Sequence, residues 1–293
     1  MISPGADVQI DSDTVRSLLA AHHPDLADLA LTHLDAGWDN SSWRLGDDLV
    51  VRLPRRAAAV PLAEREHRWL PGLAPSLPLP VPVPLRVGAP TDRYPWPWSV
   101  VPWLDGEPGD RAPVADAEGS ARRLGVFLRA LHQPAPADAP HNPYRGVPVA
   151  DRTTMVEERM AELGGVVDVG SVRTVWNDAC AVPPWRGAPV WLHGDLHPAN
   201  VLVDVGVLAA VIDFGDICAG DPATDIAAAW MLLPSTAMSA FLHTYGEDDE
   251  PLLRRARGWA VFFGLMLLSI GLSDKPTYEA IGRGTLRRAT DMT

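Results

Sequence analysis

Two polar clusters between positions 191 and 216 contain the residues of this chain that are best suited to chemistry. Asp195 precedes Asn200 by five residues in the first cluster, and Asp213 opens the second, which reads Asp-Phe-Gly. A carboxylate such as that of Asp195 can accept the proton of an attacking hydroxyl group. Amide and carboxylate oxygens, as in Asn200 and Asp213, are the ligands that hard divalent cations prefer. Together these groups provide what the transfer of a phosphoryl group to a hydroxyl requires.

Two apolar segments must position these clusters. Residues 201–204 follow the first cluster and residues 208–212 precede the second, with Val205-Gly206-Val207 between them. A β-hairpin with its turn at these three residues would bring the two clusters together.

The spacing of the polar residues resembles a known motif. Asp195 and Asn200 keep the interval of the kinase catalytic loop, H-R-D-L-x-x-x-N, with D-F-G downstream, and Gly194 replaces the arginine. The stretch therefore resembles the aminoglycoside phosphotransferase family, antibiotic and small-molecule kinases whose loop usually begins H-G-D. The resemblance implies that Asp195 is catalytic, that Asn200 and Asp213 hold Mg²⁺, and that ATP or GTP is the phosphoryl donor.

A metal-hydrolase cluster is the alternative interpretation of the first polar cluster. His193, Asp195 and His197 alternate as they would on one face of a strand, and such residues can bind a metal ion. Gly194 and Pro198 instead favour a loop, because both residues are poorly tolerated inside a strand.

The resemblance also implies which residues support the catalytic loop. The stretch at 220–227, Gly-Asp-Pro-Ala-Thr-Asp-Ile-Ala, matches the family's G-D-P-x-x-D-L-A. Its second aspartate, Asp225, is expected to hold the loop by hydrogen bonding, and His193 and His197 are assigned to the same support. Asp221 predicts a helix N-cap, with proline at the first helical position.

The polar stretch at 37–45 is expected to cover the phosphates of the nucleotide. In a kinase-like fold a strand-turn-strand lies here, and small residues let backbone N–H groups approach the phosphates. Ser41 and Ser42 are the expected contacts, through backbone N–H groups or hydroxyls.

A kinase places a lysine on its third strand, paired with a glutamate, to hold the phosphates. Lys275 is the only lysine of this chain, against 24 arginines, and it lies far from that strand. Arg52 stands at the matching place, so we expect it to replace the lysine. Its expected partner is Glu66, which belongs to an E-x-x-x-L pattern of the family, and Glu64 is the alternative.

The segment at 101–106, Val-Pro-Trp-Leu-Asp-Gly, resembles the family's hinge. A purine would be bound there by main-chain groups, with the carbonyl of Pro102 and the N–H of Leu104 as candidates. Pro102 lacks an N–H, but only its carbonyl is needed.

The predicted fold is α+β, two-lobed and protein-kinase-like. We expect an N-terminal nucleotide-binding lobe at 1–104, with a five-stranded antiparallel sheet and a helix, and a mostly helical C-terminal catalytic and acceptor-binding lobe at 105–293. Hydrophobic periodicity and turn residues predict helices at 11–22, 61–73, 113–132, 152–163, 171–180, 235–245, 250–272 and 275–290, and strands at 29–34, 49–53, 85–88 and 98–104.

The composition is typical of a globular protein, with 47% hydrophobic and 21% charged residues. The net charge of −12 argues against nucleic acid or an anionic membrane as a partner. Cys180 and Cys218 are the only cysteines, which suits a reducing compartment, and the first 13 residues lack the features of a signal peptide. We therefore expect a cytoplasmic enzyme, with the apolar segment at 259–270 as a core helix too short to span a bilayer.

The acceptor is expected to be an aminoglycoside or a related antibiotic, as in antibiotic-resistance enzymes of the family. A polyamine needs carboxylates around its reacting hydroxyl, and Asp216, Glu247 and Asp248 are the candidates. The acidic net charge agrees with a cationic small-molecule acceptor.

Three alternatives remain open at the level of the sequence. Trp230, Trp259 and Phe262 could line an apolar pocket for a macrolide or another neutral acceptor. The acceptor could also be a metabolite of the homoserine or choline type. The missing lysine leaves open a nucleotide-binding module without catalytic activity.

Overall fold

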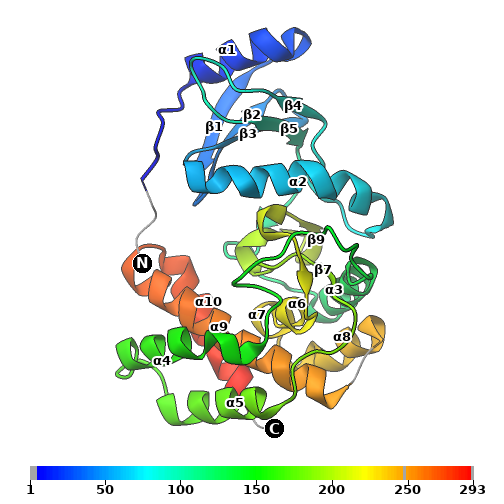
Figure 1. Ribbon diagram of the computed structural model, residues 1–293, viewed down its shortest axis with the longest axis vertical. Helices are drawn as coiled ribbons and strands as arrows, with labels where there is room; N and C mark the ends of the chain where they lie inside the picture. The colour runs from blue at the N-terminus through cyan, green and yellow to red at the C-terminus, as the bar shows by residue number, and fades with distance from the viewer. Residues whose placement is uncertain (1–4, 247–248, 292–293) are drawn as a thin grey trace.

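An antiparallel sheet occupies one end of the molecule and helices fill the other, in a computed structural model that describes residues 5–246 and 249–291 (Figure 1). The five strands lie in the order β1-β2-β3-β5-β4, and every pairing is antiparallel, as predicted. The strands are β1 Leu31–Ala36, β2 Asn40–Leu45, β3 Leu49–Pro54, β4 Arg86–Gly88 and β5 Trp98–Pro102. β5 ends two residues earlier than predicted, at Pro102, and one further ladder bond follows it, from the N–H of Trp103 to the carbonyl of Asp48 at 2.7 Å.

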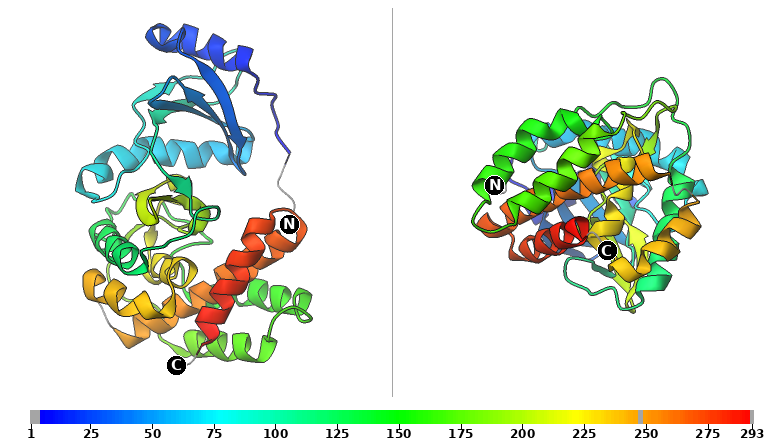
Figure 2. Two further views of the ribbon diagram at one scale, coloured as in Figure 1. Left: turned by 180° about the vertical axis from the view of Figure 1, so that it is seen from behind. Right: turned by 90° about the horizontal axis from the view of Figure 1, so that it is seen from below.

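Two helices lie on opposite faces of the sheet (Figures 1 and 2). Helix α1, Ser12–His22, begins after Asp11, whose carboxylate accepts the N–H of Thr14 at 2.8 Å as an N-cap. The apolar residues of α1 recur at helical spacing and those of the strands recur at every second position, so the apolar residues of the helix and of the sheet meet in one core. This core contains Val15, Leu18, Leu19, Trp43, Leu45, Val51, Leu53, Tyr94, Trp98 and Val100.

Helix α2, Val60–Leu73, lies between the sheet and the helical part of the molecule (Figure 1). Its buried Leu70 belongs to the core of the helical part, together with Leu79 and Val81 from the segment that follows. The rings of Trp69 and Trp191 lie 5.0 Å apart across this junction. The chain therefore contributes to the second core before it returns to the sheet through β4 and β5.

The helical part is built around α9, which packs against several other helices at once (Figure 2). The helix predicted at 113–132 begins later, because Asp116 caps it through the N–H of Gly119. The helix predicted to begin after Asp221 starts one residue further on, with Pro222 at its N-cap. The helices are α3 Ala117–Leu131, α4 Thr153–Glu162, α5 Val169–Ala181, α6 Ala223–Ile226, α7 Ala228–Leu232, α8 Met238–Tyr245, α9 Glu250–Ser273 and α10 Pro276–Thr290.

The predicted hairpin between the two polar clusters is present. Strand β8, Val201–Asp204, pairs with β9, Val207–Val211, and Val205 and Gly206 between them both have positive φ. A two-residue turn with positive φ at both positions matches the right-handed twist of the strands that it connects. Three shorter strands were not predicted, because two or three residues show no period: β6 Glu107–Pro108, which pairs with β8, and β7 Val190–Leu192, which pairs with β10 Cys218–Gly220.

Helix α9 is the one helix among the described residues that is long and apolar enough to cross a membrane by length and composition. It has 24 residues, and 67% of its most apolar window is buried inside the fold. Its apolar residues are therefore occupied by packing against the other helices, as expected of a core helix.

The close packing of α10 on α9 gives the first prediction. A Cβ atom at Gly282 would lie 2.5 Å from the backbone nitrogen of Leu268, so Gly282→Ala must push the two helices apart. Such overpacking should lower the free energy of unfolding by about 1–3 kcal/mol, measured by denaturant titration. Gly72→Ala is the control, because a Cβ atom there meets no atom within 4 Å and alanine favours a helix. Equal stability of the Gly282→Ala variant and the wild type would show that α10 is not held at this distance.

Candidate functional site

A cavity of about 780 Å³ lies between the sheet and the helices, and both polar clusters open into it. Its lining takes residues from the polar stretch before β2, from the two polar clusters that flank the β8–β9 hairpin, and from α9 and α10. Six of the predicted site residues line it: Ser42, Asp195, His197, Asn200, Asp213 and Asp216. Seven others lie outside the lining: Ser41, Arg52, Glu66, Pro102, Leu104, His193 and Asp225.

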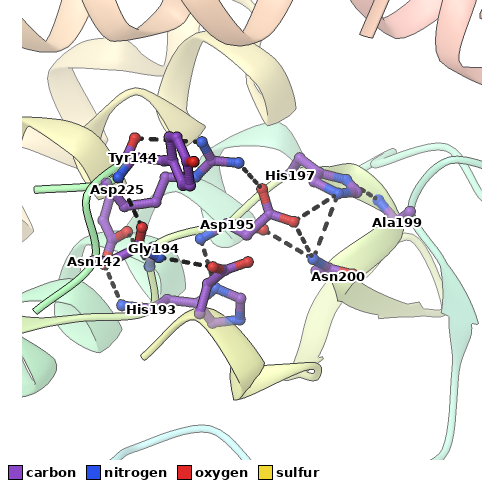
Figure 3. A network of polar contacts seen from close by, with 11 residues as sticks. Asn142, Tyr144, His193, Gly194, Asp195, His197, Ala199, Asn200 and Asp225 are labelled. Carbon is purple, nitrogen blue, oxygen red and sulfur yellow. Dashed lines mark hydrogen bonds and ion pairs between the residues drawn. The ribbon is translucent and has the colours of Figure 1, made fainter. Parts of the chain in front are cut away.

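The carboxylate of Asp195 has three polar neighbours, and among them the amide nitrogen of Asn200 lies 3.4 Å from its Oδ2 (Figure 3). His197 Nε2 lies 3.4 Å from its Oδ2, and Arg145 Nη2 donates to its Oδ1 at 3.1 Å. The amide nitrogen of Asn200 donates to the backbone carbonyl of Asp195 at 2.9 Å. This last bond orients Asn200 and leaves its Oδ1 atom for another partner.

The surroundings of Asp195 keep it ionised. Burial raises the pKa of its carboxyl, but His197 and Arg145 outweigh this effect, so that the pKa lies below its usual range. A carboxylate that stays charged and is only partly covered can still accept a hydrogen bond from a further hydroxyl.

Asp225 holds the backbone that precedes Asp195. Its carboxylate is fully buried, and its two oxygens accept the N–H groups of His193 at 2.7 Å and Gly194 at 2.9 Å. His132 Nε2 lies 3.4 Å from the same carboxylate. These are the hydrogen bonds that the predicted support of the loop requires.

Both ring nitrogens of His193 are used within the protein. Its Nε2 lies 2.9 Å from the carbonyl of Ile212, and its Nδ1 accepts the N–H of Asp195 at 3.2 Å. The neutral ring with its proton on Nε2 satisfies both bonds. His193 therefore ties the first cluster to the second and has no nitrogen left for a metal ion, which removes the basis of the metal-hydrolase alternative.

Asn200 and Asp213 are suited to a magnesium ion. Both line the cavity and present oxygen atoms, the ligands that this ion prefers. Asp213 has a left-handed backbone, with φ of 64°, and its side chain is 47% exposed. Among the described residues no group of three or more His, Cys, Asp or Glu could hold a metal by itself. An ion at this place would therefore take further ligands from a bound substrate, as magnesium commonly does.

The expected ion pair between Arg52 and Glu66 is present. Arg52 Nη1 lies 2.5 Å from Glu66 Oε1, and Arg52 Nη2 lies 3.2 Å from Asp213 Oδ1. Burial raises the pKa of Glu66 to about 7, against the opposing effect of Arg52. Glu64 is exposed on the other side of α2, which excludes it as the partner. Arg52 thus joins the sheet, α2 and the second polar cluster.

Ser41 and Ser42 point to opposite faces of β2. The hydroxyl of Ser41 is buried in the core and accepts the indole N–H of Trp43 at 3.0 Å, so only its backbone is available to a ligand. Ser42 lines the cavity, opposite Arg52 in the strand register. Asp39 and Arg56 form an ion pair beside it and also line the cavity.

The remaining expected site residues are those for the purine and those for the acceptor. Pro102 ends β5 against Leu49, and Leu104 follows it outside the cavity lining, so their contacts with a purine stay predictions. Phe262 lines the cavity, whereas Trp230 and Trp259 pack in the helical core instead. Glu247 and Asp248 lie outside the described residues.

Asp216 lies in the cavity wall but is not a free carboxylate. The side-chain amide of Asn142 donates to its Oδ1 at 2.7 Å. Burial, followed by the charge of Asp195, raises the pKa of Asp216. The amide of Asn142 thus occupies one of the two carboxylate oxygens that a cationic acceptor would contact.

The sequence did not identify the loop that supplies Asn142 and Arg145. The loop at 132–148 is rich in proline and shows no periodic pattern, so nothing in it indicated a contact with Asp195 or Asp216. These contacts depend on where the loop crosses β10, and the N–H of Ala219 donates to the carbonyl of Pro140 there.

Residues 30–259 match the model of the phosphotransferase enzyme family. A sequence search of curated proteins gives no significant match. Among solved structures, the GDP complex of wild-type aminoglycoside 2′-phosphotransferase-IIIa superposes with a TM-score of 0.71 at 19% identity, covering 96% of this chain and 99% of that one. The apoenzyme of macrolide 2′-phosphotransferase MphH from Brachybacterium faecium has a TM-score of 0.63 at 28% identity, covering 96% and 99%. The predicted two-lobed kinase-like α+β fold is confirmed by these superpositions.

The buried ion pair gives the second prediction. Glu66→Ala leaves a buried guanidinium with only Asp213 as a partner and should cost up to about 3–5 kcal/mol of unfolding free energy. A double-mutant cycle with Arg52→Ala should show a coupling of about 0.5–3 kcal/mol. Glu64→Ala is the matched control on the same helix and should change stability by less than about 0.5 kcal/mol. Additive effects of Arg52→Ala and Glu66→Ala would contradict the pairing.

Proposed function

Because the chain belongs to the phosphotransferase enzyme family, we propose that it moves the γ-phosphate of ATP or GTP to a hydroxyl group of a small molecule. The observation that carries this proposal is the opening of Asp195, Asn200 and Asp213 into one cavity. The fold alone would not suffice, since one fold can serve several functions.

In this proposal Asp195 orients the acceptor hydroxyl and receives its proton. The proximity of Arg145 and His197 keeps its carboxylate charged and ready to accept the hydrogen bond. Asn200 and Asp213 would hold Mg²⁺, which supplies positive charge to the phosphate oxygens. Arg52 and the backbone of the stretch before Ser42 would bind the phosphates, and the hinge at Pro102 and Leu104 the purine.

The position of Arg52 supports an active enzyme over an inactive nucleotide-binding module. A module without activity was suggested by the missing lysine of the third strand. Arg52 supplies a permanent positive charge at that strand and reaches Asp213, a proposed cation ligand, at 3.2 Å. The charge that the reaction needs is therefore available without a lysine.

The cavity wall supports an apolar acceptor of the macrolide type. Helix α9 contributes a continuous apolar face to it, and Met155 and Tyr144 also line the cavity. Pockets for drug-sized ligands commonly combine such apolar walls with a few polar groups. The apolar lining residues of α9 are Phe262, Phe263, Met266, Leu267 and Ile270.

The charges of the cavity support the same acceptor class. Its lining carries as many cationic as carboxylate side chains, and three of the carboxylates are ion-paired with arginine within the protein. A polyamine would therefore find little uncompensated negative charge. The cations are Arg56, Arg111, Arg145, Arg152 and Lys275, and the carboxylates are Asp39, Asp110, Asp195, Asp213 and Asp216.

An aminoglycoside stays the second candidate. Solved structures of similar fold include the GDP and kanamycin complex of an aminoglycoside phosphotransferase, at 19% identity and a TM-score of 0.70. Within this chain, Asp110 lines the cavity, and one of its oxygens has no hydrogen-bond partner in the described part of the protein.

The third prediction concerns Asp195. Asp195→Ala should reduce turnover by about 10²–10⁴-fold, the scale of a lost general base, while nucleotide affinity stays near that of the wild type. Phosphoryl transfer and nucleotide binding are measured separately, by product formation and by calorimetry. Asp204→Ala, at an exposed carboxylate on the hairpin, is the control. Turnover within a few-fold of the wild type would remove Asp195 from the mechanism.

The fourth prediction separates the two acceptor classes. With Mg²⁺ and ATP or GTP, we expect phosphorylation of a macrolide, with a KM that is nearly independent of salt between 0.1 and 1 M. An aminoglycoside bound by exposed charges would instead show a KM that rises steeply, since the Debye length falls from about 10 Å to about 3 Å over that range. Turnover of aminoglycosides alone, with this salt dependence, would contradict the macrolide assignment and leave the phosphotransferase proposal intact.

A further inference from the structure

Arg145 stands between the catalytic carboxylate and the apolar wall. Its guanidinium donates to Asp195 Oδ1 at 3.1 Å, and its Cζ atom lies 5.0 Å from the ring centroid of Phe263 and 5.7 Å from that of Phe262. The side chain is 19% exposed and lines the cavity. A permanent positive charge therefore lies at the point where an acceptor hydroxyl must approach Asp195.

The backbone on both sides of Arg145 is tied down. On one side, Asn142 accepts the N–H of Tyr144 at 2.8 Å and donates to Asp216. On the other side, the N–H of Gly146 donates to Thr224 Oγ1 at 3.1 Å, and its carbonyl accepts the N–H of Asp221 at 2.9 Å. The backbone is thus anchored on both sides of Arg145, while Asp195 and the rings of Phe262 and Phe263 hold its guanidinium.

Gly146 shows how closely this loop is packed. Its φ is +68°, and a Cβ atom there would lie 2.7 Å from the side chain of Leu192 and 2.9 Å from the Cα atom of Gly220. Only glycine allows the chain to pass β7 and β10 at this distance and in this conformation. The backbone position of Arg145 is therefore set by the fold.

We propose that Arg145 determines which acceptors the site admits, by placing a fixed positive charge beside Asp195 that repels polycationic acceptors and leaves uncharged hydroxyl groups free to approach. The proposal rests on the proposed function in taking this cavity as the acceptor site. A second cation, Arg152, lies over the ring of Tyr144 at 5.4 Å and lines the same wall. The positive charge thus extends along the loop side of the cavity, and at Arg145 it adjoins the apolar face of α9.

The test measures the binding of a polycation directly, so that it does not depend on turnover. Calorimetric titration of kanamycin into the full-length protein, saturated with Mg²⁺ and a non-hydrolysable nucleotide, compares the wild type with Arg145→Gln and Arg145→Lys. Arg145→Gln should bind kanamycin about tenfold more tightly or better, because a like charge at close range is removed. Arg145→Lys keeps the charge and should reject kanamycin as the wild type does.

Two controls make the result specific to this charge. Arg122→Gln removes an exposed arginine of α3, which pairs with Glu118 away from the cavity, and should leave kanamycin binding as in the wild type. By the same titration, an uncharged oligosaccharide of similar size, which carries no charge for the guanidinium to repel, should bind Arg145→Gln and the wild type alike. The melting temperature and nucleotide affinity of each variant show that it is folded.

Equal affinity of the wild type and Arg145→Gln for kanamycin, or gain of binding in Arg145→Lys, would overturn the proposal. Failure of the wild type to phosphorylate any macrolide would contradict the acceptor assignment instead. The two failures are distinguishable, because one is read from the binding of a polycation and the other from product formation.

Discussion

The buried carboxylate of Asp225 is the interaction on which the rest of the site depends. Its two oxygens accept the N–H groups of His193 and Gly194, so the loop that leads into Asp195 has one position. An unpaired charge at a fully buried place would be costly, and these hydrogen bonds offset that cost. Because the donors are backbone groups, the carboxylate fixes the course of the chain rather than a single side chain.

From this point the site is connected to both parts of the molecule. His193 reaches the carbonyl of Ile212, which precedes Asp213, and Asp213 reaches Arg52 on the sheet. Arg52 in turn pairs with Glu66 of α2, a helix that also contacts the helical part through Trp69 and Trp191. Polar contacts therefore run without a break from the loop under Asp195 to the middle of the sheet.

The acceptor side depends on a different kind of constraint. A proline-rich loop without secondary structure passes close to β7 and β10 and is held there by backbone hydrogen bonds. It brings Asn142 to Asp216, where the amide occupies one carboxylate oxygen, and Arg145 to Asp195, where the guanidinium compensates the negative charge that an acceptor would meet. The net charge of −12 thus says little about this cavity, where carboxylates are matched by arginines.

The sequence by itself determined the elements whose residues lie close together along the chain. The spacing of Asp195 and Asn200, the hairpin that carries Asp213, the N-cap of α1 and the antiparallel sheet all follow from local patterns, since a strand, a turn and a cap are set by neighbouring residues. Even the ion pair of Arg52 with Glu66 could be predicted from the sequence, because both residues stand at positions of the family's motifs. Only the tertiary structure decided that the Ser41 hydroxyl faces the core while Ser42 faces the cavity, that Asp216 is covered by Asn142, and that Arg145 reaches Asp195. The contacts of Asn142 and Arg145 join segments 50 or more residues apart, and one of these segments is a loop with no periodic pattern. Which side of β2 faces the core depends on where the core forms. Tertiary packing therefore decides the two contacts and the orientation of the strand.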